Sequence, residues 1–317
     1  MRIDSLLGMS ERGPIICATD LSPSGHEAVE IAAQMAAATG NALRLLHVCA
    51  EGPDEGVEPS SEGERVYRER LQRRRVAAGA ALEKERGRAE AFGPHTTGTL
   101  LSGRPWEALV NTATSEDASM IVVGPHGHNG PKSAARRGLS EWILGSTADR
   151  VLRHAPCPVL IGPRGDERSH PIGGGTWMVA VDFSEPSREA LRLAKAMAAA
   201  CQAKLVALYV SDDPILRLDP AGDAEPFPPL DAVAKEMAEH KRKELDGFVK
   251  GTLGEAVETH VAIGEPASEI ASHAAEIEAR LIIMGTHGRT GLAHFFLGST
   301  AERTLRTSGV PVLCVRV

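Results

Sequence analysis

The chain repeats itself along its length of 317 residues. Residues 124–153 and 285–306 both begin with a glycine-rich turn and continue through Gly-Ser-Thr-Ala, and each is followed by Pro-Val-Leu. Earlier positions repeat at a spacing of 162 residues, as in the pairs Asp20 and Asp182, Val48 and Val210. A duplication on this scale predicts two copies of one structural unit, each with the length of an ordinary domain.

Each copy alternates short apolar runs with helix-like segments. The first run ends in aspartate, a turn containing serine and proline follows, and an alanine-rich segment leads to the next apolar run. Uniformly apolar runs separated by helices are typical of parallel strands that are buried on both faces. We therefore predict two tandem doubly wound α/β domains, at 14–163 and 175–317, each with five parallel strands in the order βαβαβαβαβ. Residues 163–175 are expected to form the linker.

Composition narrows the functional classes. A net charge of −7 and a pI near 6.0 do not suit a general nucleic-acid binder. The five cysteines lack C-x-x-C spacing and are expected to be reduced core residues. No signal-like start or long apolar run is present, so we expect a cytoplasmic protein that does not enter a membrane. Six arginines within residues 65–75 are interpreted as a solvated helix face paired with the interleaved glutamates.

The strand ends of the second copy suggest a ligand site. In a doubly wound sheet, ligands bind beyond the carboxyl ends of the strands, where the strand order reverses. Asp182 ends the first strand there, and its carboxylate suits a ribose hydroxyl or an adenine amine. The segment after the fourth strand has the spacing G-x2-G-x9-G-S, formed by Gly285, Gly288, Gly298 and Ser299. Glycines let backbone amides approach an anion, and the start of a helix favours phosphate.

The same residues also fit roles that need no ligand. Ser299 with Glu302, and Ser146 with Asp149, match a capping box, which would serve only the helix itself. Asp182 could likewise cap the following turn without any ligand. Histidines in the two glycine-rich turns lack partners at metal-ligand spacing, and we expect them to be loop residues and no metal to be held by them: His126, His128 and His287.

These motifs resemble those of a tandem universal stress protein of the ATP-binding branch, whose glycine motif has this spacing. The resemblance covers both copies and implies adenine nucleotide alpha hydrolase-like domains. It implies that Asp182 and the backbone of Val210 hold adenine and ribose. It further implies that ATP, with Mg²⁺, has its phosphates surrounded by Gly285, Gly288, Gly298, Ser299 and Thr300.

The first copy departs from the family pattern. Its corresponding site residues are Asp20, Val48, Gly124, Gly127, Gly145 and Ser146. Seventeen residues instead of nine separate Gly127 from Gly145, and the extra segment is 131–138. The insertion could separate the glycine turn from the helix start, or it could bring Lys132, Arg136 and Arg137 to a phosphate as a basic flap. We expect weakened or absent binding in this half.

The expected function is that of a nucleotide-dependent stress-response regulator rather than an enzyme. No P-loop, G-x-S-x-G or kinase motif is present, although slow ATP hydrolysis or autophosphorylation at Ser299 or Thr300 stays open. The alternative is an interaction scaffold that binds no nucleotide. In both cases we expect the halves to form an intramolecular pseudo-dimer through their last strands, with a further homodimer or a protein partner left open.

Overall fold

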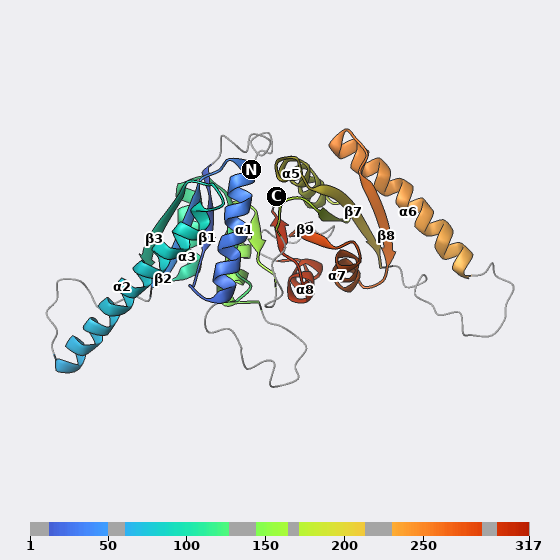
Figure 1. Cartoon of the computed structure of the whole chain (residues 1–317). Helices are drawn as coiled ribbons and strands as arrows, with labels where there is room; N and C mark the ends of the chain where they lie inside the picture. The colour runs from blue at the N-terminus through green and yellow to red at the C-terminus, as the bar shows by residue number, and fades with distance from the viewer. Residues whose placement is uncertain are drawn as a thin grey trace. The chain divides into compact units, whose positions relative to one another are not determined.

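A computed structural model of the chain describes residues 13–49, 61–126, 144–163, 171–212, 230–286 and 297–316. The first half of the chain folds into a parallel sheet whose strands alternate with helices (Figure 1). Its strands are β1 (Gly13–Ala18), β2 (Leu43–Cys49), β3 (Thr96–Ser102), β4 (Ala118–Val123) and β5 (Val159–Ile161). Its helices are α1 (Pro23–Thr39), α2 (Glu62–Glu90), α3 (Pro105–Ser115) and α4 (Ser146–His154). The strand order is β3-β2-β1-β4-β5, with all pairs parallel.

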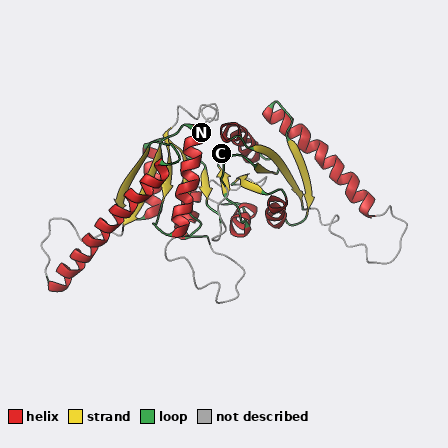
Figure 2. Ribbon diagram, viewed as in Figure 1, coloured by secondary structure: helices red, strands yellow, loops and turns green. Residues whose placement is uncertain are grey.

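The second half forms a separate unit with the same order of elements (Figure 2). Its strands are β6 (Thr176–Val181), β7 (Lys204–Ser211), β8 (Glu258–Ile263), β9 (Ala279–Gly285) and β10 (Val312–Val315). Its helices are α5 (Glu185–Cys201), α6 (Leu230–Leu253), α7 (Pro266–Glu276) and α8 (Ser299–Thr307). The strand order is β8-β7-β6-β9-β10, again parallel throughout. The predicted fold class, two doubly wound α/β domains of five parallel strands, is confirmed.

The central strands of each sheet are buried on both faces, which explains their uniformly apolar sequences. In β1, Ile15, Ile16 and Cys17 are fully buried in succession, and every residue of β4 is buried. The cysteines are free thiols, four of them buried. Burial raises the pKa of Cys201 to about 11 and that of Cys314 to about 12, so these thiols stay protonated near neutral pH.

A serine and a proline define the start of the first helix in each half. Ser22 and Ser184 are the N-caps, and their hydroxyls accept from the backbone N–H three residues later, at 3.2 and 3.3 Å. A proline in the first turn is tolerated because the N–H that it lacks would have no helical partner there. These caps place each helix directly after the aspartate that ends the first strand.

The arginines of helix α2, expected to form a solvated face paired with interleaved glutamates, are paired only in part. Arg65 pairs with Glu62 and Arg68 with Glu64, at 2.6 and 2.7 Å. The other four arginines of the stretch form no ion pair with any described residue. The pairing with interleaved glutamates therefore holds for two of the six arginines.

The described part of the linker, residues 171–175, is hydrogen-bonded to the second unit. Arg280 of β9 donates through Nη1 to the carbonyl oxygens of Pro171 and Gly173, at 3.1 and 2.7 Å. Trp177 donates through Nε1 to the carbonyl of Ile172 at 2.9 Å. Within the portions of chain that the structure describes, no helix has both the length and the apolar character needed to cross a membrane.

Candidate functional site

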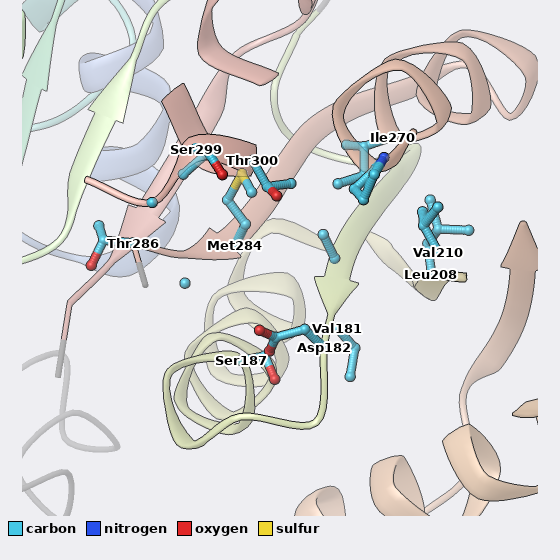
Figure 3. Close-up of a pocket in the computed structure, with 15 residues that line it drawn as sticks. Val181, Asp182, Ser187, Leu208, Val210, Ile270, Met284, Thr286, Ser299 and Thr300 are labelled. Atoms are coloured by element: carbon cyan, nitrogen blue, oxygen red, sulfur yellow. The ribbon is translucent and has the colours of Figure 1, made fainter. Parts of the chain in front are cut away.

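A pocket of about 260 Å³ opens at the carboxyl ends of β6, β7 and β9. Because β6 separates β7 from β9, the pocket lies where the strand order of the second unit reverses. Figure 3 shows Ser299 and Thr300 on one side of it, Asp182 and Ser187 on another, and Leu208, Val210 and Ile270 on a third. The lining residues are Ala180, Val181, Asp182, Ser187, Leu208, Val210, Pro266, Ile270, Met284, Gly285, Thr286, Gly298, Ser299, Thr300 and Ala301.

The pocket brings together six of the seven residues named from the sequence for this half. They are Asp182, Val210, Gly285, Gly298, Ser299 and Thr300. The seventh, Gly288, lies outside the described residues, as does His287. The structure adds apolar walls that the motif did not reveal, mainly Ile270 of α7 and Met284 of β9. Their signal was present in the repeat, because the first half has Leu109 and Val123 at the corresponding positions.

The aspartate at the end of the first strand holds the turn that follows it in both halves. Asp182 Oδ1 accepts from the Ser184 N–H at 3.0 Å and from the Ser184 hydroxyl. Asp20 Oδ1 makes the same two bonds with Ser22. The turn-capping interpretation is therefore correct for Oδ1. In the first half Oδ2 of Asp20 is buried and has no hydrogen-bond partner among the described residues, so a ligand donor would satisfy it.

The residue after each aspartate adopts a left-handed conformation that non-glycine residues rarely occupy. The φ angle is 62° at Leu21 and 64° at Phe183. This conformation brings the next N–H back to the aspartate oxygen. Strain of this kind, roughly 1 kcal/mol or more, is typical of residues that position functional groups.

Ser299 does not form the capping box that its spacing from Glu302 suggested. The N-cap of α8 is Gly298, with φ −62° and ψ 146°, and no side chain caps the helix. The carboxylate of Glu302 instead accepts from Arg306 at 2.6 Å. In the first half Gly145 is the N-cap of α4, and Asp149 pairs with Arg153. The capping-box alternative is wrong in both halves because each helix begins at the serine itself.

The first turn of α8 lines the pocket with backbone N–H groups that have no partner among the described residues. The first helical hydrogen bond runs from Glu302 N to Gly298 O, so the preceding amides have no partner within the helix. Ser299, Thr300 and Ala301, which carry these amides, all line the pocket. The hydroxyl of Ser299 makes no hydrogen bond to another described residue. Unpaired N–H groups and the positive end of the helix dipole favour an anion at this point.

A second carboxylate stabilises the rim of the pocket. Glu265 is the N-cap of α7 and accepts from Ser268 N at 2.8 Å, and it also pairs with Arg303 of α8 at 3.2 Å. Burial acts to raise the pKa of Glu265, but the hydrogen bonds from Ser268 and Arg303 outweigh it and hold that pKa below its usual value. Glu265 thus ties together two helices that line the pocket.

The ends of the glycine loop converge in the same way in both halves. Gly298 N donates to Thr286 O at 2.7 Å, and in the first half Gly145 N donates to Pro125 O at 3.0 Å. The described ends of the loop therefore meet in both halves, and the choice between the two alternatives for the insertion depends on residues beyond Pro125 and His126. Residues 127–143, which include Gly127 and His128 with the insertion 131–138, lie outside the described residues.

The other predicted residues of the first half occupy positions equivalent to those in the second. Asp20 follows β1, Val48 lies in β2, Gly124 directly follows β4, and Gly145 with Ser146 begins α4. His126 is half-buried beyond Gly124. Within the described ranges, no three His, Cys, Asp or Glu side chains gather as metal ligands.

Gly285 is required for the packing of its own unit. A Cβ at this position would lie 2.7 Å from Cβ of Pro186 and 3.1 Å from its carbonyl carbon, so β9 could not approach the start of α5. The equivalent Gly124 is less constrained, because its Cβ would lie 3.3 Å from Ser24 O. A substitution at Gly285 would therefore disturb the fold and would be a poor probe of binding.

Comparison with known proteins agrees with this architecture. The model of the universal stress protein family matches residues 11–163 and again residues 176–316. The chain belongs to the universal stress protein family. The family resemblance drawn from the sequence is thereby confirmed for both halves of this universal stress protein.

Individual relatives are moderately similar to this universal stress protein. Universal stress protein MJ0531 of Methanocaldococcus jannaschii is 34% identical over 140 residues, which are 44% of this chain and 80% of that protein. Universal stress protein Rv2005c of Mycobacterium tuberculosis is 28% identical over 205 residues, 64% of this chain and 63% of that protein. The crystal structure of a universal stress protein from Archaeoglobus fulgidus matches 96% of both chains with a TM-score of 0.62 and 22% identity, a likeness of fold.

Proposed function

We propose that this universal stress protein binds ATP in its second half and acts as a nucleotide-dependent regulator of the stress response. One observation carries the proposal. The pocket joins a carboxylate at the end of a strand, Asp182, to the unpaired N-terminal amides of α8, with an apolar wall between them. Pockets that combine apolar walls with a few convergent polar groups are typical small-molecule sites.

Each part of the pocket suits one part of an adenine nucleotide. Leu208, Ile270 and Met284 supply apolar surface for a base. Asp182 can accept a hydrogen bond from a ribose hydroxyl. The Ser299 hydroxyl and the backbone N–H groups beside it can donate hydrogen bonds to phosphate oxygens. The described residues enclose about 260 Å³, close to the lower end of the ~300–1,000 Å³ of small-molecule pockets.

Mg²⁺ would accompany the phosphates. Magnesium in nucleotide sites is usually held by phosphate oxygens, water and one or two protein oxygens. The hydroxyls of Ser299 and Thr300 are the protein oxygens on the lining of α8 that suit this contact.

We further propose that occupancy is read by a partner protein and that the chain is not an enzyme. The polar groups of the pocket are hydrogen-bond acceptors and N–H or O–H donors that can bind an anion. The sequence contains no motif of a catalytic nucleophile. Slow hydrolysis or autophosphorylation at Ser299 or Thr300 is the enzymatic alternative. A scaffold that binds no nucleotide is the alternative from another class.

Binding of ATP is tested by calorimetry on Asp182→Asn. The asparagine Oδ1 can still accept from Ser184 and preserve the turn, but Oδ2 is replaced by an amide donor that a ribose hydroxyl or an adenine amine cannot satisfy in the same way. The loss of one hydrogen bond to a charged group costs about 1.5–3 kcal/mol, so we expect at least tenfold weaker binding at the tighter site.

Asp20→Asn is the matched control, because it makes the same change in the first half. It should leave the affinity of the tighter site unchanged. An Asp182→Asn protein that binds ATP as the unmodified protein does would show that the site is misplaced. A protein that binds no ATP at all, with or without Mg²⁺, would favour the scaffold.

A further inference from the structure

The N-terminal half of α2 exposes an unusual concentration of apolar side chains. The large hydrophobic residues that are exposed within the described part of the chain are Val66, Tyr67, Val76 and Phe92. Three of them lie within eleven residues of one helix, with exposed fractions of 41%, 53% and 64%. The first buried residue of α2 is Leu82, and Figure 1 shows the preceding part of the helix projecting beyond the strands of its own unit.

Unpaired arginines alternate with these apolar residues. Arg70, Arg73 and Arg74 have neither an ion pair nor a hydrogen bond with any residue that the structure describes. At about 3.6 residues per turn, Val66, Arg70 and Arg73 follow the middle of one half of the helix surface, with Tyr67 and Arg74 at one edge of that half and Val76 at the other. We call this set the arginine face: Val66, Tyr67, Arg70, Arg73, Arg74 and Val76.

The arginine face has the composition of a binding surface rather than of a solvated helix. Exposed hydrophobic residues that occur singly need no explanation, but a cluster of them marks an interaction site. Tyrosine and arginine are also the residue types enriched among those that dominate interface energetics. Residues 62–76 carry six arginines and three glutamates in a chain whose net charge is −7, so the face is a local positive region on an acidic protein.

We propose that the arginine face binds an acidic segment of a partner protein that also carries apolar side chains. Carboxylates would pair with Arg70, Arg73 and Arg74, while apolar side chains would cover Val66, Tyr67 and Val76. Charge complementarity selects this occupant. The same face of a second copy is disfavoured, because a twofold contact would set arginine against arginine. A nucleic acid is disfavoured because binding its phosphate backbone takes many cationic contacts, whereas this face offers three unpaired arginines on an acidic chain.

The test uses a displayed library of random 16-residue peptides selected on the full chain. Binding of the enriched peptides is then measured by fluorescence anisotropy. We expect the enriched peptides to combine Asp or Glu with apolar residues. We also expect at least tenfold weaker binding to the variant R70E/R73E/R74E, weaker binding to Y67S/V76S, and loss of affinity at high salt.

Lys84→Glu is the matched control, because Lys84 is an exposed cation of the same helix that lies outside the arginine face. It should leave peptide binding unchanged. Arginine and glutamate have similar helix propensities, so circular dichroism should show each variant folded. A folded charge-reversal variant keeps the test informative.

Several results would overturn the proposal. Enriched peptides without an acidic bias, or equal binding to R70E/R73E/R74E, would show that the arginines do not select the partner. Self-association that the same variant abolishes would identify a second copy as the occupant. Residues 51–60 carry four acidic residues and directly precede the helix, so tenfold tighter peptide binding after their deletion would show that the chain's own segment occupies the face.

Discussion

Two serines near helix starts in the second half have opposite relations to their helices. Ser184 is an N-cap whose hydroxyl accepts from Ser187 N and donates to Asp182. Ser299 is the first residue inside its helix, and its hydroxyl has no partner among the described residues. The first serine therefore contributes to the fold, while the second is available to a ligand in the pocket.

This contrast predicts that Ser299→Ala and Ser184→Ala separate stability from binding. Ser184→Ala should lower the free energy of unfolding by about 1 kcal/mol, since it removes a cap. Ser299→Ala should change stability by no more than about 0.5 kcal/mol, as exposed substitutions usually do, yet weaken ATP binding. Thermal unfolding and calorimetry on the two variants provide the measurement. Equal destabilisation by both substitutions would contradict this prediction and indicate that Ser299 caps its helix.

The sequence placed Ser299 at a helix start but could not say which residue is the cap. The pattern Ser-x-x-Glu fits a serine cap and also a helix that begins at the serine, because glycine is itself accepted as an N-cap. The backbone angles of Gly298 decide between them. Asp182 was predictable because an acid at the end of an apolar strand must emerge at the sheet edge. The role of the neighbouring Met284 could be inferred only from the repeat, where Val123 takes the same position, because an apolar residue in a buried strand has no distinctive local signal.

Helices α7 and α8 are joined at the pocket by one carboxylate. Glu265 caps α7 and pairs with Arg303 of α8. The first half has Arg104 at the equivalent position, where it is an N-cap whose side chain makes no capping hydrogen bond and donates instead to Glu107 at 3.0 Å. The two halves thus fix this pair of helices differently.

We predict a pH-dependent loss of stability on Glu265→Ala. Since the pKa of Glu265 is lowered in the folded state, its contribution is present above the unfolded pKa and is lost as pH falls through the folded pKa. Near pH 7 the variant should lose about 0.5–1 kcal/mol, the usual worth of a partly exposed cap. Below the folded pKa the difference should disappear.

Urea unfolding near pH 7 and at acid pH measures this effect, with Arg104→Ala as the control. The control should be nearly neutral at both pH values because Arg104 makes no capping bond. A difference for Glu265→Ala that stays constant as the pH falls would show that packing, rather than the carboxylate, accounts for it.

At the scale of elements, the order of strands and helices followed from the sequence, while the surroundings of α2 did not. Strands β1 and β6 are apolar except for Thr176, which predicts strands buried on both faces. The pairing of arginines on α2 depends on how far the helix extends past its sheet and on which rotamers reach a glutamate. Neither is encoded in the local pattern, so Arg70 and Arg73 were expected to be paired but form no ion pair with any residue that the structure describes.

For the whole molecule, the duplication raises the question of how many nucleotides one chain holds. The described residues of the two sites correspond closely, with Asp20 for Asp182 and the same hydrogen bond closing the glycine loop. We therefore expect any difference in affinity to arise mainly from the few substituted wall positions and from the two glycine loops, residues 127–143 and 287–296. The expected pairing of the terminal strands, as an intramolecular pseudo-dimer, also stays a prediction.

We predict one tightly held ATP per chain, in the second half, and weaker binding in the first. Loop length alone is not the obstacle, since doubling a loop costs only about 0.6 kcal/mol of closure entropy. The obstacle is the need for Gly127 to meet the same phosphate as the first turn of α4 across a longer, basic segment. Deleting residues 131–138 restores the nine-residue spacing and should strengthen the weaker site. Calorimetry measures that site with the deletion made in the Asp182→Asn variant, in which binding at the second half is weakened. Two equivalent nucleotides in the unmodified protein, or one that is lost in Asp20→Asn and retained in Asp182→Asn, would instead show that the insertion assists binding, with its arginines and lysine directed at the phosphates.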